Sequence, residues 1–415
     1  MGMLNNMPSL RFPEFSIAWE TKKLGEIAQV SAGATPSTLK REYWGGSIRW
    51  MNSGELNLKR VIEVENRITE IGLKKSSTKL IPKHSILIGL AGQGKTRGTV
   101  AMNMVELCTN QSIASVLPNE EVYYSDYLYH NLDNRYDELR SLSTGDGGRG
   151  GLNLQIIKSL VIELPTLPEQ QKIATFLTSV DTKLTQLKQK KNLLEQYKKG
   201  VMQKIFSQEI RFKDDEGKEF LEWEEKKLGQ IGQTYNGLTG KTKENFGQGK
   251  PYIQYKQIFD DSKIDILRFE YVEIGENESH NKVLFGDIFF TVSSETPDEI
   301  GTASVLLDKV DELYLNSFCF GYRPISFEIL SPFFARYLFR SENFRSNIVK
   351  LAQGSTRYNM SKVQLMKLEI LLPNSAEQNK IANFLSALDE KINHCSAQIE
   401  KTEHWKKGLL QQMFC

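Results

Sequence analysis

The sequence has few of the residues and runs that would tie it to a metal, a membrane or secretion. Its 415 residues include four cysteines and five histidines, with no CxxC or HExxH pair, which argues against disulfides and a structural zinc site. No apolar run of about 18 residues is present to span a membrane. The first residues lack the basic end and apolar stretch of a signal peptide. We therefore expect a cytoplasmic protein with reduced thiols and no metal site.

Catalytic signatures are also missing. No Pro-Pro pair occurs, so the Asp/Asn-Pro-Pro-Tyr/Phe motif of amino-methyltransferases is absent, and neither Gly-x-Ser-x-Gly nor a paired Cys/His arrangement is found. We therefore expect no catalytic residues in this chain. The net charge of +2 is only mildly basic, so a nucleic-acid partner would require locally concentrated positive charge or help from another subunit.

What the sequence does contain is a long segment that occurs twice. Residues 170–183, QQKIATFLTSVDTK, return as residues 378–391, QNKIANFLSALDEK, at a shift of 378 − 170 = 208. Residues 19–27, WETKKLGEI, return as residues 223–231, WEEKKLGQI, at a shift of 223 − 19 = 204. Two copies of about 200 residues indicate a duplicated domain. The repeat predicts a pseudo-twofold molecule.

Each copy of the first segment predicts a long helix. Capping boxes begin them, Thr166-x-x-Glu169 and Asn374-x-x-Glu377. The apolar positions then alternate at spacings of four and three: Ile173, Leu177, Val180, Leu184 and Leu187, and Ile381, Leu385, Leu388 and Ile392. This 3.5-residue period is typical of a coiled coil, interrupted where Lys191 and Lys198 fall on the seam. Because the two helices lie in duplicated domains, we expect them to pair antiparallel.

Ahead of each helix, the two copies follow the same order of elements. Short strand-like runs at 85–88 and 287–290 come first. Aromatic amphipathic segments at 123–142 and 332–351 follow, and each is predicted to be helical. A glycine-rich loop with an arginine, a short helix and a strand complete each copy. The predicted fold class is therefore α/β, of the mixed α+β kind.

One segment matches a nucleotide-binding motif formally. Residues 89–96 read Gly-x-x-x-x-Gly-Lys-Thr, the pattern of a P-loop. That motif requires a helix immediately afterwards, whereas residues 97–101, RGTVA, favour none, and the second copy has SSETP at 293–297. Nucleotide binding through Gly89–Thr96 is kept as the alternative function. The preferred interpretation is a loop whose tip differs between equal scaffolds, which suggests two different ligands.

Polar side chains at or near these loops are the candidate DNA contacts. Arg149 and Arg357 lie in the glycine-rich loops and could reach a phosphate or a guanine edge. Because both copies retain the arginine, we favour a shared contact that does not depend on sequence. The full set of candidates is Arg49, Asn52, Gln93, Lys95, Thr96, Arg97, Arg149, Gln254, Lys256, Ser294, Thr296 and Arg357.

Taken together, these motifs resemble a known family. Two Trp-x-x-Lys-Lys-Leu-Gly-x-Ile segments, two arginine loops and the two segments beginning EQQKIA (169–174) and EQNKIA (377–382) resemble the specificity subunit of type I restriction-modification systems. The resemblance implies two target recognition domains, at 1–165 and 211–373, separated by antiparallel coiled-coil helices at 166–210 and 374–415. Each domain would read one half of a bipartite double-stranded DNA target.

The resemblance also implies partners. Two methyltransferase (modification) subunits would dock on the helices and bring S-adenosylmethionine, and restriction subunits using ATP and Mg²⁺ can join them, so no cofactor is expected in this chain. It would be a non-catalytic subunit of a methyltransferase and endonuclease complex that methylates DNA. The predicted docking residues are Gln170, Lys172, Ile173, Phe176, Gln378, Lys380, Ile381 and Phe384.

Overall fold

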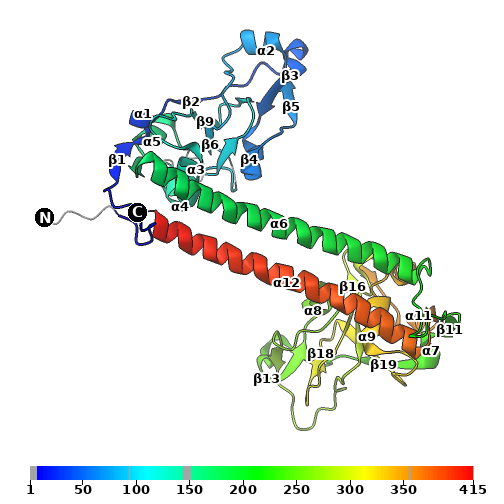
Figure 1. Ribbon diagram of the computed structural model, residues 1–415. Helices are drawn as coiled ribbons and strands as arrows, with labels where there is room; N and C mark the ends of the chain where they lie inside the picture. The colour runs from blue at the N-terminus through cyan, green and yellow to red at the C-terminus, as the bar shows by residue number, and fades with distance from the viewer. Residues whose placement is uncertain (1–6, 93, 144–150, 355–356, 415) are drawn as a thin grey trace. The chain divides into compact units, whose positions relative to one another are not determined.

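The computed structural model describes residues 7–92, 94–143, 151–354 and 357–414, and the chain divides into two compact units. Unit 1 is Met1–Lys188 with Ala397–Cys415, and unit 2 is Gln189–Ser396. Two long helices, α6 (Leu167–Phe206) and α12 (Ser375–Met413), each contribute to both units (Figure 1). The helices predicted from the duplicated segment are therefore confirmed, as is the mixed α/β class.

Unit 1 contains two sheets, a short strand pair and small helices. The larger sheet has the order β2 (Val30–Ala32), β9 (Ile113–Val116), β6 (Ile86–Gly89), β7 (Val100–Asn103) and β4 (Arg60–Val61). In the smaller sheet, β3 (Trp44–Met51) lies between β5 (Asn66–Ile68) and β8 (Cys108–Thr109), and β1 (Glu20–Lys23) pairs with β10 (Val161–Leu164). The helices are α1 (Leu24–Ile27), α2 (Glu70–Lys74), α3 (Ser125–Asn134), α4 (Tyr136–Ser141) and α5 (Leu154–Ser159), with 3-10 turns η1 (Arg41–Tyr43) and η2 (Ser53–Leu58).

Unit 2 repeats this plan. Its main sheet has the order β12 (Gly232–Asn236), β19 (Cys319–Pro324), β15 (Ile288–Thr291) and β17 (Ala303–Val305). A second sheet has β13 (Phe246–Ile253) between β14 (Glu270–Val272) and β18 (Tyr314–Leu315), and the pairs are β11 (Glu224–Lys227) with β21 (Glu369–Leu372) and β16 (Ser293–Ser294) with β20 (Tyr358–Asn359). The helices are α7 (Leu228–Ile231), α8 (Tyr255–Asp260), α9 (Pro332–Leu338), α10 (Glu342–Val349) and α11 (Lys362–Leu365), with 3-10 turns η4 (Lys243–Asn245) and η5 (Pro297–Glu299).

The two strand-like runs are confirmed as β6 and β15. Both strands are buried along their whole length, because each lies inside its sheet with a neighbour on either side. This explains why their sequences are continuous apolar runs instead of alternating ones. The two loops whose tips differ between the copies begin at the carboxyl ends of these strands.

The predicted aromatic helices are each broken in two, which corrects the expectation of single helices at 123–142 and 332–351. In unit 1, α3 ends at Asn134, because the φ of −96° and ψ of 24° of the next residue, Arg135, lie outside helical geometry. In unit 2, a new helix starts where the Ser341 hydroxyl accepts a hydrogen bond from the Phe344 amide. A serine that caps the second helix favours the break, and periodicity alone did not show it.

Within each unit, the start of one long helix packs beside the end of the other. The buried cluster of unit 1 contains Ile173, Leu177, Val180, Leu409, Leu410 and Met413. That of unit 2 contains Ile205, Phe206, Ile381, Leu385 and Leu388. The helices are thus antiparallel inside each unit, as predicted. The same clusters include α3 and α9, so this part of each seam is buried against the α/β domain as well as against the other helix.

The polar interruption of the seam is an ion pair that occurs twice. Lys198 of α6 bonds Asp389 of α12 in unit 2, and Lys406 of α12 pairs with Asp181 of α6 at 2.6 Å in unit 1. The two pairs are related by the repeat, since 406 − 198 and 389 − 181 both equal 208. A lysine on an apolar seam fixes the register of the helices when its partner is this specific. In the part of the chain that the structure describes, no helix has the length and apolar character needed to cross a membrane.

Candidate functional site

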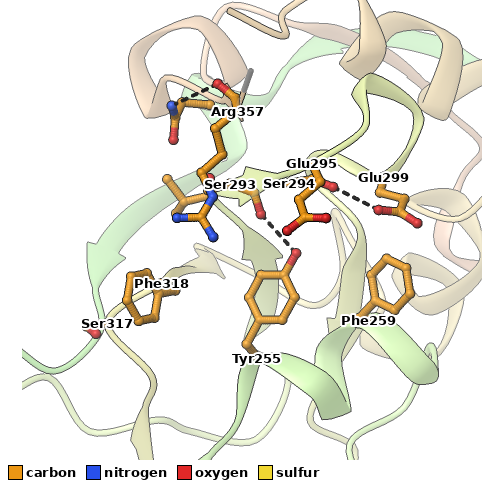
Figure 2. A pocket seen from close by; sticks show the side chains of 11 residues that line it. Tyr255, Phe259, Ser293, Ser294, Glu295, Glu299, Ser317, Phe318 and Arg357 are labelled. Carbon is orange, nitrogen blue, oxygen red and sulfur yellow. Dashed lines mark hydrogen bonds between the residues drawn. The ribbon is translucent and has the colours of Figure 1, made fainter. Parts of the chain in front are cut away.

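An open cavity of about 650 Å³ lies in unit 2, at the carboxyl end of β15. Four segments distant in sequence meet there: the loop from β15 to η5, helix α8, the turn before β19, and strand β20 (Figure 2). The lining residues are Tyr255, Phe259, Val292, Ser293, Ser294, Glu295, Glu299, Ser317, Phe318, Arg357 and Asn359. We treat this cavity as the candidate site.

Hydrogen bonds hold the loop that forms one wall of the cavity. Strand β16 pairs with β20, so that Ser294 lies opposite Tyr358. The Ser294 hydroxyl donates to the Glu299 carboxylate at 2.9 Å, and the Thr302 hydroxyl donates to the Glu299 carbonyl at 2.7 Å. From α10, Arg345 donates to the carbonyl of Ile300 at 2.6 Å. The loop is therefore fixed at several points and can present side chains in defined positions.

Aromatic rings form the floor and one rim of the cavity. Tyr255 and Phe259, one turn apart on α8, have nearly parallel rings with centroids 6.5 Å apart. The Tyr255 hydroxyl donates to the Ser293 carbonyl at 2.9 Å, and burial raises the pKa of this phenol, so it remains a neutral donor. Phe318 is 64% exposed. Such rings offer flat apolar surface to an incoming ligand.

Two opposite charges enter this cavity, one from the residue after β16 and one from the residue before β20. Figure 2 shows the Arg357 guanidinium reaching in from the β20 side, while the Glu295 carboxylate extends from the loop above Tyr255. Both residues are exposed, and within the ranges described neither side chain makes a hydrogen bond or ion pair. Glu299, by contrast, already accepts the Ser294 hydroxyl. Glu295 and Arg357 are therefore the two charged groups left to bind something outside the chain.

Unit 1 builds the matching loop on equivalent contacts. The Leu152 amide donates to the Leu90 carbonyl at 2.8 Å, as the Met360 amide donates to Val292 at 2.9 Å in unit 2. From α4, Arg140 donates to the carbonyl of Gly94 at 2.5 Å. The same support thus carries different tips.

The structure overturns the nucleotide-binding alternative. After Thr96, residues 97–98 form a turn, and strand β7 begins at Val100. A P-loop needs a helix at this point, because the amide groups of its first turn and the helix dipole hold the phosphates. Without that helix, Lys95 is an exposed side chain on a connection between two strands.

The other predicted DNA contacts of unit 1 are scattered. Arg49 lies on β3 and pairs with Glu63 at 3.4 Å, while the Asn52 side chain caps η2 by accepting from the Gly54 amide at 2.8 Å. These two residues already have partners within unit 1. Thr96 and Arg97 are half-buried near Lys95 at the loop base. Gln93 and Arg149 lie outside the described residues.

In unit 2, only some predicted residues reach the cavity. Ser294 and Arg357 line it. Gln254 precedes α8, and Lys256 pairs with Asp260 at 2.9 Å on the exposed side of that helix. Thr296 is exposed but does not line the cavity.

Sequence patterns did not identify the remaining lining residues. Tyr255, Phe259, Glu295 and Phe318 match no motif and come from three separate segments. Two of them directly follow predicted contacts, since Tyr255 follows Gln254 and Glu295 follows Ser294, whereas Phe259 and Phe318 do not. The pairing of β16 with β20 places Glu295 near Arg357, and the hydrogen bond from Tyr255 to the Ser293 carbonyl holds α8 against the same loop.

Several predicted docking residues are internal. Gln170 and Gln378 are each 1% exposed, and Ile173 and Ile381 are buried in the cores of their units. Gln170 donates to the Pro165 carbonyl at 2.8 Å, and Gln378 makes the same bond to Pro373 at 2.9 Å. A partner could touch these four side chains only by unpacking the unit. This placement corrects their assignment as surface contacts.

The other four predicted docking positions contact short preceding segments, which cover the two phenylalanines in part and leave Lys172 exposed. In unit 1, Lys172 bonds Glu14, and Phe176 packs edge-on against Phe12 with ring centroids 6.0 Å apart. In unit 2, the equivalents are Lys380, which pairs with Asp215 at 2.6 Å, and Phe384, whose ring centroid lies 5.7 Å from that of Phe212.

A buried anchor, which the sequence reading missed, fixes the start of each long helix. The Glu169 carboxylate, fully buried, accepts from Arg11 at 2.6 and 2.7 Å and from the Trp19 indole at 3.3 Å. In unit 2, Glu377 accepts in the same way from Arg211 at 2.9 Å and from the Trp223 indole at 3.2 Å. These carboxylates were expected to complete capping boxes; the expected cap itself is seen in unit 2, where Asn374 accepts from the Glu377 amide at 2.9 Å.

The signal for this anchor was an Arg-Phe pair at 11–12 and 211–212. Its shift of 211 − 11 = 200 differs from the 204 of the tryptophans, because the second connection is four residues longer. Because of this different spacing, the two Arg-Phe pairs do not match when the copies are aligned on their tryptophans.

Two copies of one α/β domain, each anchored at the start of a long helix and each bearing a different loop tip, define a duplicated two-site scaffold. The chain belongs to the family of the type I restriction modification DNA specificity domain, whose model matches residues 17–196 and 221–403.

Known relatives agree with this membership. The MjaIX type I restriction enzyme specificity subunit of Methanocaldococcus jannaschii is 30% identical over 255 residues, which are 58% of this chain and 58% of that protein. The alignment thus spans little more than half of that relative's length. The MjaVIII specificity subunit of the same organism is 25% identical across 97% of this chain and 93% of its own. A solved type I S subunit from M. genitalium shares the fold, with a TM-score of 0.59 at 16% identity over 99% of both chains.

Proposed function

We propose that this chain is the non-catalytic DNA-recognition subunit of a type I restriction-modification complex, with each unit reading one half of a bipartite double-stranded target. The observation that carries the proposal is the pair of matched loops whose tips carry opposite charges. Lys95 occupies the tip in unit 1 and Glu295 the tip in unit 2, on supports held by equivalent hydrogen bonds. Two recognition units with different loop tips suit a DNA target with two different halves.

Adenine methylation would be carried out by partner subunits. S-adenosylmethionine would bind to two modification subunits, and ATP and Mg²⁺ to restriction subunits that join the complex. The mildly basic charge of this chain fits that division, because phosphate contacts can be shared among subunits.

The direct test is a map of methylated adenines in cells that carry the modification subunits, with and without this chain. With the chain present, we expect methylation at one bipartite sequence composed of two different halves. Deleting the chain should abolish that methylation while the modification subunits are still produced. Methylation that persists at the same sequence without the chain would contradict the proposal.

The modification subunits would dock on the solvent-facing side of the long helices. Thr175 of α6 and Asn383 of α12 are exposed at equivalent positions of the repeat, since 383 − 175 = 208. Neither the Arg–Glu–Trp anchors nor the covering segments bury them. These exposed positions replace the buried Ile173 and Ile381 as the places to test docking.

Thr175→Arg is expected to remove one of two modification subunits and to leave the other bound. A long charged side chain at a close-packed contact adds both a clash and a desolvation cost. Co-purification followed by mass measurement should show one modification subunit per chain in Thr175→Arg or Asn383→Arg, and none in the double variant. Gln196→Arg, at an exposed position farther along α6, is the matched control and should retain two. Two subunits retained by the folded double variant would place docking elsewhere.

A further inference from the structure

The cavity of unit 2 has a charge that is unusual for a surface meant to face DNA. Glu295 and Glu299 line it, although DNA carries a phosphate charge about every 1.7 Å along its axis and repels carboxylates. Glu299 is already satisfied by Ser294, whereas Glu295 makes no hydrogen bond or ion pair within the described ranges. A carboxylate in this place gains from a ligand that offers hydrogen-bond donors. On DNA, those donors are the exocyclic amino groups of the bases.

The two base pairs with a major-groove amino group present it differently. In an A·T pair, the adenine amino group lies between two acceptors, adenine N7 and thymine O4, which would both repel a carboxylate. In a C·G pair, the cytosine amino group lies at one end of the pattern, followed by guanine O6 and N7. A carboxylate can therefore approach cytosine without meeting an acceptor on its outer side.

Arg357 supplies the complementary half of this pattern. It directly precedes β20, which pairs with β16 just before Glu295, so the two side chains enter the cavity from neighbouring segments (Figure 2), and the Arg357 guanidinium has no partner within the described ranges. Arginine donates two hydrogen bonds to guanine O6 and N7. Because Arg357 lies beside a carboxylate, we favour a contact with the edge of a guanine. The amino-acid sequence had instead led us to expect a phosphate contact that does not depend on the DNA sequence.

We propose that Glu295 and Arg357 together read one C·G base pair in the half of the DNA target bound by unit 2. Glu295 accepts from the cytosine amino group, and Arg357 donates to the guanine. This inference rests on the proposed function, because it requires that unit 2 bind duplex DNA. The tip of unit 1, which carries Lys95, would read a different pair.

The test uses the purified complex of this chain with its modification subunits and duplexes in which each base pair of the unit 2 half-site is replaced in turn. At one C·G position, we expect the wild-type complex to prefer that pair by about 10- to 100-fold, the range for one well-formed base contact. In Glu295→Gln, the preference for C·G over A·T should fall to within about threefold, because glutamine pairs well with adenine. Arg357→Gln should lose discrimination at the same position and at no other.

Asp298→Asn is the matched control, because it removes one negative charge from the same loop at a residue that does not line the cavity. It should raise affinity for all duplexes alike and leave discrimination unchanged. If Glu295→Gln changes the affinity for every duplex by one common factor, or if the unit 2 half-site contains no C·G pair, the inference is wrong. A wild-type complex with no sequence preference would instead refute the proposed function.

Discussion

Replacing Arg11 or Arg211 by methionine is expected to lower the free energy of unfolding of its own unit by about 3–5 kcal/mol, the usual effect of leaving one partner of a buried ion pair uncompensated. The carboxylates of Glu169 and Glu377 are fully buried, and the arginine side chains are only 10% and 20% exposed. Without its arginine, each carboxylate keeps one side-chain donor among the described residues, the indole of Trp19 or Trp223. Amide hydrogen exchange at the starts of α6 and α12 would locate the loss in the altered unit.

Two further variants separate charge from packing. Adding Glu169→Gln to Arg11→Met should recover much of the lost stability, because a neutral amide removes the buried charge and still accepts from Trp19. Lys172→Met removes an exposed partner of Glu14 and should change stability little, since surface pairs are weak. An Arg11→Met chain as stable as the wild type would show that the buried carboxylate is satisfied in some other way.

Placing a second copy of residues 228–368 in place of residues 24–160 is expected to give a methylated target whose two halves have the same sequence. The splice points suit this exchange, because Lys23 lies opposite Val161 in the β1–β10 pair, and Lys227 lies opposite Glu369 in the β11–β21 pair. The anchors and long helices stay unaltered. The former half-site of unit 1 should disappear entirely from a genome-wide map of methylated adenines.

The reciprocal exchange is the control for this experiment. Residues 24–160 placed at 228–368 should double the other half-site. If either chimera folds and still methylates the original two-part sequence, the exchanged residues do not read DNA. The specificity would then reside in the helices or in a partner.

The helices and the domain duplication could be predicted from sequence, because periodicity indicates the helices and repeated segments indicate the duplication. The 3.5-residue period and the start signals identified α6 and α12, and fixed shifts identified the repeat. The strands β6 and β15 were predicted as short strand-like runs. Local patterns could not show, however, that Gln170 bonds the chain inside its own unit, because a polar residue at a helix start is usually exposed.

By itself, the sequence determined that this chain has two equal scaffolds with different tips, joined to two long helices, and that it resembles one family. Tertiary structure decided which residues are buried and which meet. Glu295 and Arg357 are 357 − 295 = 62 residues apart and share a cavity only because β16 pairs with β20. Arg11 and Glu169 meet across 158 residues. Contacts between distant segments depend on how strands and helices pack, and periodicity along the chain carries no record of that packing.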